Sequence, residues 1–336
     1  MRSIAWLFAI LIAATSPIRA WDPDGHLLVA TIAYDHLNPK AKTAVDQLAP
    51  QVVSPGDLYN PITLSCWMDD LRGQYPNLPY RGDFFPWHYI DFGLSPNDPK
   101  PDVEPGQDNE TAGNAVTALK RAYVVLQGGT DPYIKTPAMA LAIATHLVGD
   151  IHQPLHGATW FHQEANGRWM NDAGGNRVTV INGPSFEKTY NLHYFWDAAW
   201  RASFDPATGR VEVDKLHENW NHHAAATVSA LARELEVSLK PADTVRLTPD
   251  FEAWALESNQ IARDVVYPRL TFTENHKIAR ISADYVALAN PLARQRMVLA
   301  GYRLAALLNA TLGAATPGPV PPSYPAGPPM AIVPPR

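Results

Sequence analysis

The chain has 336 residues, a formal net charge of −6, 46% hydrophobic residues and a single cysteine, Cys66. This acidic balance argues against a nucleic-acid-binding protein that works through basic patches, and a single cysteine excludes an intramolecular disulfide. The length and the apolar content are enough for one large domain that is stabilised by its core.

The first twenty residues have the pattern of a secretory signal peptide. Arg2 makes the start positive, residues 4–14 form an apolar run too short to span a membrane, and the small residue Ala20 ends the segment. We therefore predict cleavage before Trp21 and a secreted or periplasmic protein. Without this segment the chain keeps 25 basic and 33 acidic residues, a net charge of −8.

Apolar residues recur at helical spacing over most of the remaining chain. They predict helices over residues 26–37, 39–48, 61–71, 116–126, 138–153, 215–239, 249–267 and 291–312. Two loops are expected over residues 95–108 and 161–175, and residues 178–183 predict the only hairpin-like element. We thus predict an all-α fold: a single multi-helix domain over residues 21–313 with a small β-hairpin, followed by a proline-rich, disordered tail over residues 314–336.

The stretch HLVGDIHQPLH, residues 146–156, is typical of a metal site. His146 and Asp150 are four residues apart, so on a helix they project from one face and can bind a common ion. Pro154 ends the helix, which allows His156 to approach from another direction. For one such pair alone, a histidine hydrogen-bonded to a helix carboxylate is the simpler interpretation.

A second pair with the same spacing, His193 and Asp197, occurs in NLHYFWD, where Phe195 and Trp196 point toward a core. Two pairs together favour a metal site. Trp21 adds a potential ligand after cleavage, because a neutral α-amine binds zinc; the alternative is that Trp21 simply packs. Three dications would bring the net charge near −2 and leave a locally positive cleft that can hold a phosphodiester.

Residues 87–92 alternate like a short extended segment. This places His88 and Ile90 on one side and Tyr89 and Asp91 on the other. A lone histidine in such a segment is usually structural.

In order along the chain, these motifs resemble those of the zinc-dependent S1/P1 nucleases, and the resemblance runs from Trp21 to near Leu312. The shared motifs are an N-terminal tryptophan with a nearby histidine, Trp-x-Asp, His-Tyr-Ile-Asp, His-xxx-Asp-xxxxx-His and Asn-Leu-His-xx-Trp-Asp. The resemblance implies an all-helical secreted phosphodiesterase, related in architecture to zinc phospholipase C, with three zinc ions per chain. The lack of disulfides fits a bacterial member better than a fungal or plant one.

The resemblance also implies nine metal ligands in three groups. The first ion takes Asp69, His88, His146 and one oxygen of Asp150; the second shares Asp150 and adds His26 with the amine and carbonyl of Trp21; the third takes His156, His193 and Asp197. Nitrogen and oxygen donors of this kind suit zinc.

The implied reaction is hydrolysis of single-stranded DNA and RNA to 5′-mononucleotides, with 3′-nucleotidase activity beside it. A hydroxide between two zinc ions bridged by Asp150 attacks phosphorus, and the third zinc stabilises the departing 3′ oxygen. Arg72 neutralises the transition-state phosphate, and Asp69 orients the nucleophile. Without the resemblance, these two residues would be a surface ion pair of little value.

Substrate binding is assigned in the same way. Tyr89 would stack on a base, Asp91 would bind its edge, and Asn176 would line the same pocket. Stacking requires an unstacked base, which implies single strands.

Two other functions are consistent with parts of the pattern. A phospholipase C of the same three-zinc architecture would end its last motif in glutamate, so Asp197 together with Asp91 favours the nuclease. A non-catalytic zinc-binding surface protein would need no Arg72. We expect nucleic acid and nucleotides as the substrates, no stable membrane span and a monomer.

Overall fold

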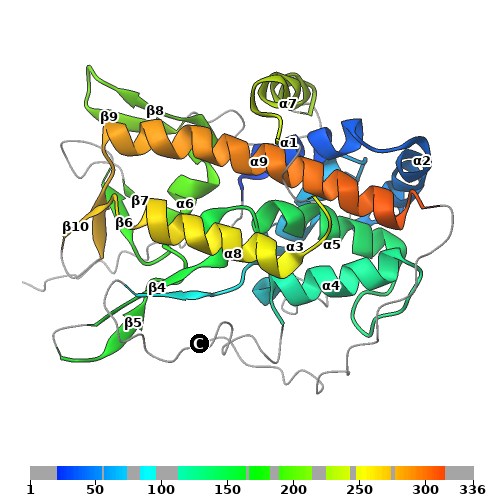
Figure 1. Cartoon of the computed structure of the whole chain (residues 1–336), viewed down its shortest axis with the longest axis horizontal. Coiled ribbons are helices and arrows are strands. Elements are labelled where there is room, and N and C mark those ends of the chain that lie inside the picture. The colour runs from blue at the N-terminus through cyan, green and yellow to red at the C-terminus, as the bar shows by residue number, and fades with distance from the viewer. Residues whose placement is uncertain are drawn as a thin grey trace, which may run out of the picture.

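The computed structural model describes residues 21–54, 57–73, 84–95, 113–163, 166–181, 189–213, 225–242, 247–273 and 277–314. These residues form mainly helices (Figure 1). The α-helices are α1 (Pro23–Asp35), α2 (Pro39–Leu48), α3 (Trp67–Gly73), α4 (Ala115–Leu126), α5 (Pro137–Asp150), α6 (Leu192–Asp197), α7 (Ala225–Leu239), α8 (Phe251–Ile261) and α9 (Ala283–Thr311). Short 3₁₀ turns are η1 (Ala49–Gln51), η2 (Thr63–Cys66), η3 (Phe85–His88), η4 (Pro154–Gly157) and η5 (Ala199–Arg201), and a π turn, η6 (Ala262–Val266), continues α8.

Helix α5 is the central element of the fold. It packs against α1, α3, α4 and α9, and all of its residues except Pro137 and Met139 are buried. A helix that is apolar on every side belongs in the interior, and Thr136 begins this one by accepting a hydrogen bond from the Met139 N–H. The two polar groups at its C-terminal end, His146 and Asp150, are therefore carried into the core.

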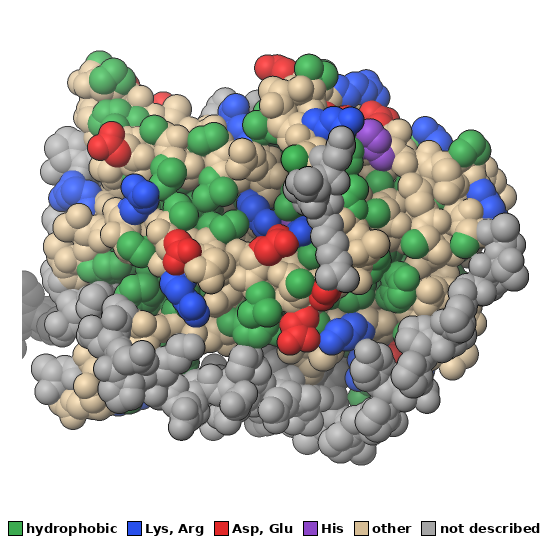
Figure 2. Space-filling model, in the orientation of Figure 1, with side chains coloured by type: hydrophobic (Ala, Val, Ile, Leu, Met, Phe, Trp, Pro, Cys, Tyr) green, Lys and Arg blue, Asp and Glu red, His purple; other side chains and the backbone are tan. Residues whose placement is uncertain are grey.

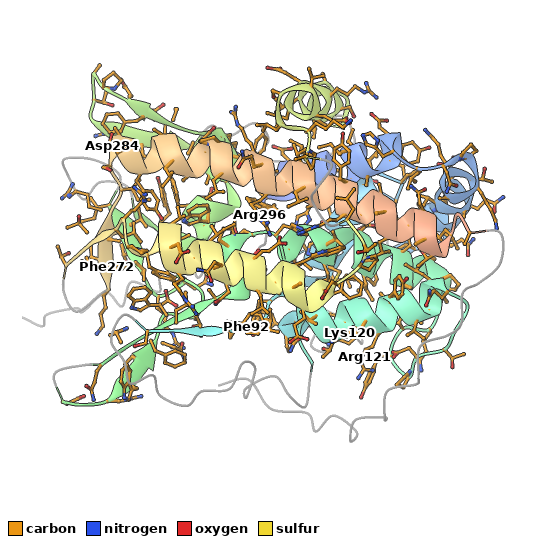
Figure 3. The ribbon with its side chains drawn as sticks, viewed as in Figure 1. Phe92, Lys120, Arg121, Phe272, Asp284 and Arg296 are labelled. Carbon is orange, nitrogen blue, oxygen red and sulfur yellow. The ribbon has the colours of Figure 1, made fainter. Side chains whose placement is uncertain are left out.

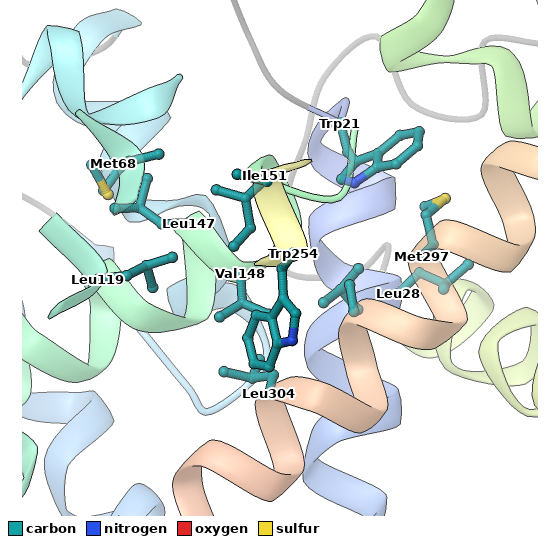
Figure 4. Packing of buried hydrophobic residues seen from close by; sticks show 14 of the residues in the cluster. Trp21, Leu28, Met68, Leu119, Leu147, Val148, Ile151, Trp254, Met297 and Leu304 are labelled. Carbon is teal, nitrogen blue, oxygen red and sulfur yellow. The ribbon is translucent and has the colours of Figure 1, made fainter. Parts of the chain in front are cut away.

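Buried side chains from several helices meet around the end of α5. Figure 4 shows Trp254 of α8 beside Val148 of α5 and Leu304 of α9, with Leu28 of α1 close by. Helices α1 and α9 approach each other closely because α9 carries Gly301, where an added Cβ would lie 2.6 Å from the Ile32 side chain. This packing fixes the helices that carry the polar groups described below.

Within the described residues, short strands form four small sheets, which gather mainly at the end away from α2 (Figure 1). The strands are β1 (Val53–Ser54), β2 (Asp57–Leu58), β3 (Gly93–Leu94), β4 (Thr159–Gln163), β5 (Trp169–Asn171), β6 (Thr179–Ile181), β7 (Thr189–Asn191), β8 (Ala202–Asp205), β9 (Arg210–Val213), β10 (Thr271–Thr273) and β11 (Ile278–Arg280). The sheet orders are β1-β2, β10-β11-β6-β7, β3-β4-β5 and β8-β9. The parallel pairing of Gly93 with Thr159 holds the segment after η3 beside η4, and the pairing of β6 with β7 leads directly into α6.

The predicted mainly helical fold is confirmed, but two of its details are wrong. Residues 161–175 contain parts of a hairpin, β4 with β5, and β8 with β9 forms another, so residues 178–183 are not the only such element. Gly167 supplies the left-handed backbone that closes the first of these hairpins.

Three element boundaries also differ from the prediction. The last helix begins at Ala283 instead of Pro291, because Ser282 caps it by accepting a hydrogen bond from the Tyr285 N–H. Residues 61–71 divide into η2 and α3, and residues 87–92 begin inside η3 before the chain becomes extended. The signal segment over 1–20, residues 215–224, most of the loop over 95–108, and residues 315–336 lie outside the described part of the chain. None of the described helices has both the length and the apolarity needed to cross a membrane.

Candidate metal centre

Asp150, at the last turn of α5, lies at the middle of a buried group of histidines. Its Oδ2 atom is 3.1 Å from His88 Nδ1 and 3.3 Å from His146 Nε2, and these two nitrogens are 3.0 Å apart. The Oδ1 atom of Asp69, from α3, is 3.9 Å from the same His88 nitrogen and 4.0 Å from the same His146 nitrogen. The four residues predicted for the first ion thus converge from three separate elements.

The other oxygen of Asp150 faces α1. Its Oδ1 atom is 3.4 Å from His26 Nε2, and the His26 ring stacks on the His146 ring at a centroid distance of 4.0 Å. Trp21 is completely buried, and its indole N–H donates to the Gly149 carbonyl at 2.9 Å. Asp150 is therefore placed between two histidine groups, as a bridging ligand must be.

A third group forms where η4 meets α6. His156 Nε2 and His193 Nε2 are 2.9 Å apart, and Asp197 Oδ1 is 3.7 Å from the His193 nitrogen. Gln153, which the sequence analysis did not assign, donates from Nε2 to the same Asp197 oxygen at 2.8 Å and accepts the Leu155 N–H. The 146–156 motif thus contributes two residues to this group: His156, a candidate ligand, and Gln153, which orients the candidate ligand Asp197.

Backbone carbonyls fix the orientation of the histidine rings. The Nδ1–H groups of His146, His156 and His193 donate to carbonyls of Ser65, His88 and Gly174 at 2.7, 2.5 and 2.6 Å. In each neutral ring Nε2 then carries the lone pair, and it is this atom that faces the neighbouring candidate ligands.

These distances test whether the residues suit a metal ion. The Nε2 atoms of His156 and His193 face each other at 2.9 Å, and two lone pairs so placed repel unless a proton or a metal cation lies between them. Ligand atoms about 2.0–2.2 Å from a tetrahedral zinc ion lie roughly 3.3–3.6 Å apart. The observed separations of 2.9 to 4.0 Å surround that spacing, so the donor set and its geometry fit zinc.

Burial and neighbouring charges shift the pKa of His146 in opposite directions. Burial alone would lower the pKa of His146, but the carboxylates of Asp150 and Asp69 raise it to about 9. Burial raises the pKa of Asp197 well above its ordinary value, against the hydrogen bond from Gln153. Completely buried carboxylates are costly without a compensating positive charge, which a bound cation provides.

A pocket opens beside the third group. It is lined by Tyr89, Asp91, Leu155, Ala173, Gly174, Asn176 and His193. His88 and Ile90 are buried while Tyr89 and Asp91 are partly exposed, so the predicted alternation over these four residues is confirmed. The pocket brings the three residues predicted to bind substrate together with His193, a candidate ligand.

The turn over residues 172–176 forms one wall of this pocket. Ala173, Gly174 and Gly175 all have positive φ angles, and a Cβ on Gly174 would lie 2.7 Å from the Leu155 carbonyl oxygen. Asp172 anchors the turn by accepting hydrogen bonds from the Trp160 N–H and the Tyr267 hydroxyl. The sequence analysis assigned no role to this Gly-Gly pair, although the Gly174 carbonyl orients the His193 ring.

His152, the middle histidine of the 146–156 motif, is turned toward different partners. Its Nδ1–H donates to the Val148 carbonyl, and its Nε2 accepts a hydrogen bond from Arg303 at 2.9 Å. Burial lowers the pKa of His152 well below its ordinary value, and Arg296 and Arg303 lower it further, so the ring is neutral.

Both arginines belong to α9 and pair with Glu257 of α8; Figure 3 shows Arg296 between these helices. The Nε of Arg296 also donates to the His152 carbonyl at 3.2 Å. These contacts stabilise the backbone between Asp150 and His156.

The backbone of Arg72 lies in α3, but its side chain is outside the described part of the structure.

A helical domain that gathers five histidines and three aspartates beside a pocket has the features of a metal-dependent hydrolase. The model of the S1/P1 nuclease family matches residues 21–313. The chain belongs to this family.

Named relatives agree with this assignment. Endonuclease 2 of Arabidopsis thaliana is 28% identical over 321 residues, which cover 90% of this chain and 94% of the relative. Nuclease S1 of Aspergillus oryzae is 23% identical over 308 residues, covering 90% of this chain and 95% of the relative. The protein is therefore a nuclease, a hydrolase that acts on the phosphodiester bonds of nucleic acid, and its histidine and aspartate clusters suit the metal dependence of the family. Family membership favours this activity over the phospholipase C and the non-catalytic zinc-binding protein.

Proposed function

We propose that this protein is a three-zinc nuclease that hydrolyses single-stranded DNA and RNA to 5′-mononucleotides and also acts on 3′-nucleotides. The proposal rests on one observation: His193 belongs to two features of the site at once. This residue belongs to the third ligand group and also lines the pocket with Tyr89 and Asp91. A base held in the pocket therefore has its 3′ phosphate close to the candidate metal ligands.

The proposed ions would be bound by the histidine and aspartate groups described above, and the second also by the backbone of Trp21. The first site uses Asp69, His88, His146 and Asp150; the second uses the other Asp150 oxygen, His26 and the amine and carbonyl of Trp21; the third uses His156, His193 and Asp197. Bound zinc would supply a Lewis acid for the phosphate and a water of lowered pKa.

The protein groups position the reactants around that chemistry. Asp150 holds the first two sites together, because its two oxygens face different histidines. Asp69, on the edge of the first group, is placed to accept a hydrogen bond from an attacking water and to orient it. We assign Arg72 to the neutralisation of charge on the transition-state phosphate, which is the usual role of a guanidinium near a phosphoryl group.

The pocket accounts for the proposed preference for single strands. Tyr89 offers an aromatic ring and Asp91 a carboxylate that can accept hydrogen bonds from a base edge, while Asn176 closes the side. A base must leave its stack before it can enter between such groups. Bases of a single strand do so at little cost, whereas paired bases must also lose their partner.

The first test combines metal content with product analysis. Protein that begins at Trp21 should contain about three zinc ions per chain by elemental analysis and release 5′-mononucleotides from single-stranded DNA and RNA. His146→Ala should lose zinc and activity, whereas His36→Ala, at an exposed histidine, should lose neither. Three ions without nucleotide release would contradict the nuclease mechanism, and one ion or none would contradict the ligand assignment.

We also propose that the N-terminal segment is removed before Trp21, that the protein is exported and monomeric, and that its architecture is related to zinc phospholipase C. The indole of Trp21 binds the carbonyl of Gly149, the residue before Asp150, so Trp21 lies beside the second group, for which we propose its amine as a ligand. Protein that retains residues 1–20 should then bind one zinc ion fewer than processed protein. Equal zinc content in the two forms would rule out the amine as a ligand.

A further inference from the structure

Tyr194 is an exposed aromatic residue at the edge of the candidate metal centre. Within the described part of the chain, the large hydrophobic side chains that are exposed are Phe85, Tyr194, Val237 and Leu256. Tyr194 is 39% exposed, although its neighbours in α6, Leu192, Phe195 and Trp196, are completely buried. It directly follows His193, which is both a candidate ligand and a part of the pocket wall.

Hydrogen bonds through Asn191 connect the backbone of Tyr194 to the wall of the pocket. The Asn191 side chain caps α6 by accepting the Tyr194 N–H at 2.7 Å, and its amide donates to the Asn176 side chain at 3.4 Å. Asn176 itself lines the pocket. The ring of Tyr194 packs at 47° against the Tyr190 ring, with centroids 5.7 Å apart, so one aromatic residue supports the other.

We infer that Tyr194 is a second stacking surface, which binds the base next to the one held in the pocket. This inference rests on the proposed function, because it assumes a single strand at the Tyr89 pocket. A strand with one base in the pocket and the next on Tyr194 passes His193, so its linking phosphate lies beside the third ligand group. Aromatic rings bind bases of any sequence, since every base has a π face. The ligand is therefore a single-stranded nucleic acid read over two neighbouring bases.

The inference predicts that Tyr194 matters only for substrates that carry the second base. Tyr194→Ala should lower kcat/KM by about 5- to 160-fold for a thymidine dinucleotide, the range expected for loss of one stacked base. Tyr194→Phe keeps the ring and should retain most of the activity. Val237→Ala removes another exposed apolar side chain, from the outer side of α7, and should change nothing.

The decisive comparison uses dinucleotides in which one or the other nucleoside is replaced by an abasic sugar. With one of these two substrates, wild type and Tyr194→Ala should have the same kcat/KM, because the base that Tyr194 binds is missing. Zinc content should be unchanged in the variant, which separates stacking from damage to α6. An equal loss on all three substrates, or no loss on any, would overturn the inference while leaving the nuclease proposal intact. Failure of the wild type to cleave any of them would overturn both.

Discussion

Arg201 joins the start of α1 to the segment after α6, and its removal tests how strongly this junction holds the candidate metal centre. Its guanidinium pairs with the Asp22 carboxylate and lies 3.3 Å from Asp24 Oδ2. The Asp22 N–H donates to the carbonyl of Asp197, a candidate ligand, at 3.1 Å. Only 13% and 4% of the two carboxylate side chains are exposed, so Arg201→Met leaves two acids in a poorly solvated place.

These contacts set limits on the stability that Arg201→Met should lose. Removing one partner of a buried ion pair typically costs about 3–5 kcal/mol. Burial raises the pKa of Asp22 to about 6 even though Arg201 lowers it, so near pH 7 a proton can neutralise this carboxyl for about 1.4 kcal/mol or less. We therefore expect a loss near the lower limit, about 3 kcal/mol in the free energy of unfolding.

Urea unfolding at pH 7, followed by tryptophan fluorescence, measures this loss. Arg233→Met is a matched control, because Arg233 also pairs with an aspartate, Asp35, but is 65% exposed; its loss should stay below about 0.5 kcal/mol. A loss for Arg201→Met below about 1 kcal/mol, or one no larger than the control's, would refute the argument from burial.

Three further predictions concern the supports of the centre. Chelation of metal should lower Tm, because each site held at 1,000 times its Kd contributes about 4 kcal/mol; an unchanged calorimetric Tm would contradict metal binding. Gly149→Ala places a Cβ 3.1 Å from His26 Nδ1, so we expect one zinc ion fewer by elemental analysis, although alanine otherwise favours a helix. Burial raises the pKa of Glu257, but Arg303 and Arg296 outweigh it and lower the pKa below 4.5. The stability from this acid is thus complete above pH 4.5 and lost as the pH falls through the lowered pKa. Glu257→Gln should cost about 2 kcal/mol at pH 7, since Glu257 is 41% exposed, and progressively less below pH 4.5 in denaturant unfolding.

The sequence predicted the candidate ligands that lie close together in the chain. His146 with Asp150, and His193 with Asp197, have a four-residue spacing, which on a helix brings side chains to one face whatever the rest of the fold does. The structure places both pairs on helices, α5 and α6. Local periodicity was sufficient for these pairs.

Ligand candidates from distant segments could be grouped only through the family resemblance. His26, Asp69 and His88 come from α1, α3 and η3, and no spacing in the sequence relates them to one another. Their meeting depends on the packing of α5 against these elements, which periodicity does not specify. The structure brings them close together within the described part of the chain.

The hydrogen-bond partners of the histidines had almost no signal in the sequence. Ser65, His88 and Gly174 act through carbonyl oxygens, which every residue carries, so the residue type does not reveal the role. The side-chain amide of Gln153 was visible in the motif, but its contact with Asp197 crosses from η4 to α6. Such supports become apparent only when the backbone path is known.

The arrangement of charge explains how an acidic chain can act on a polyanion. Acidic and basic side chains are interspersed on the face in Figure 2, which carries no continuous basic stripe among the described residues. Three aspartates are instead concentrated in the buried centre, among the side chains of five histidines. With three dications bound, as proposed, that centre becomes positive locally while the net charge of the processed chain stays slightly negative. Attraction for phosphate is then confined to the place where the bond is cleaved, and selection among substrates falls to the aromatic surfaces beside it.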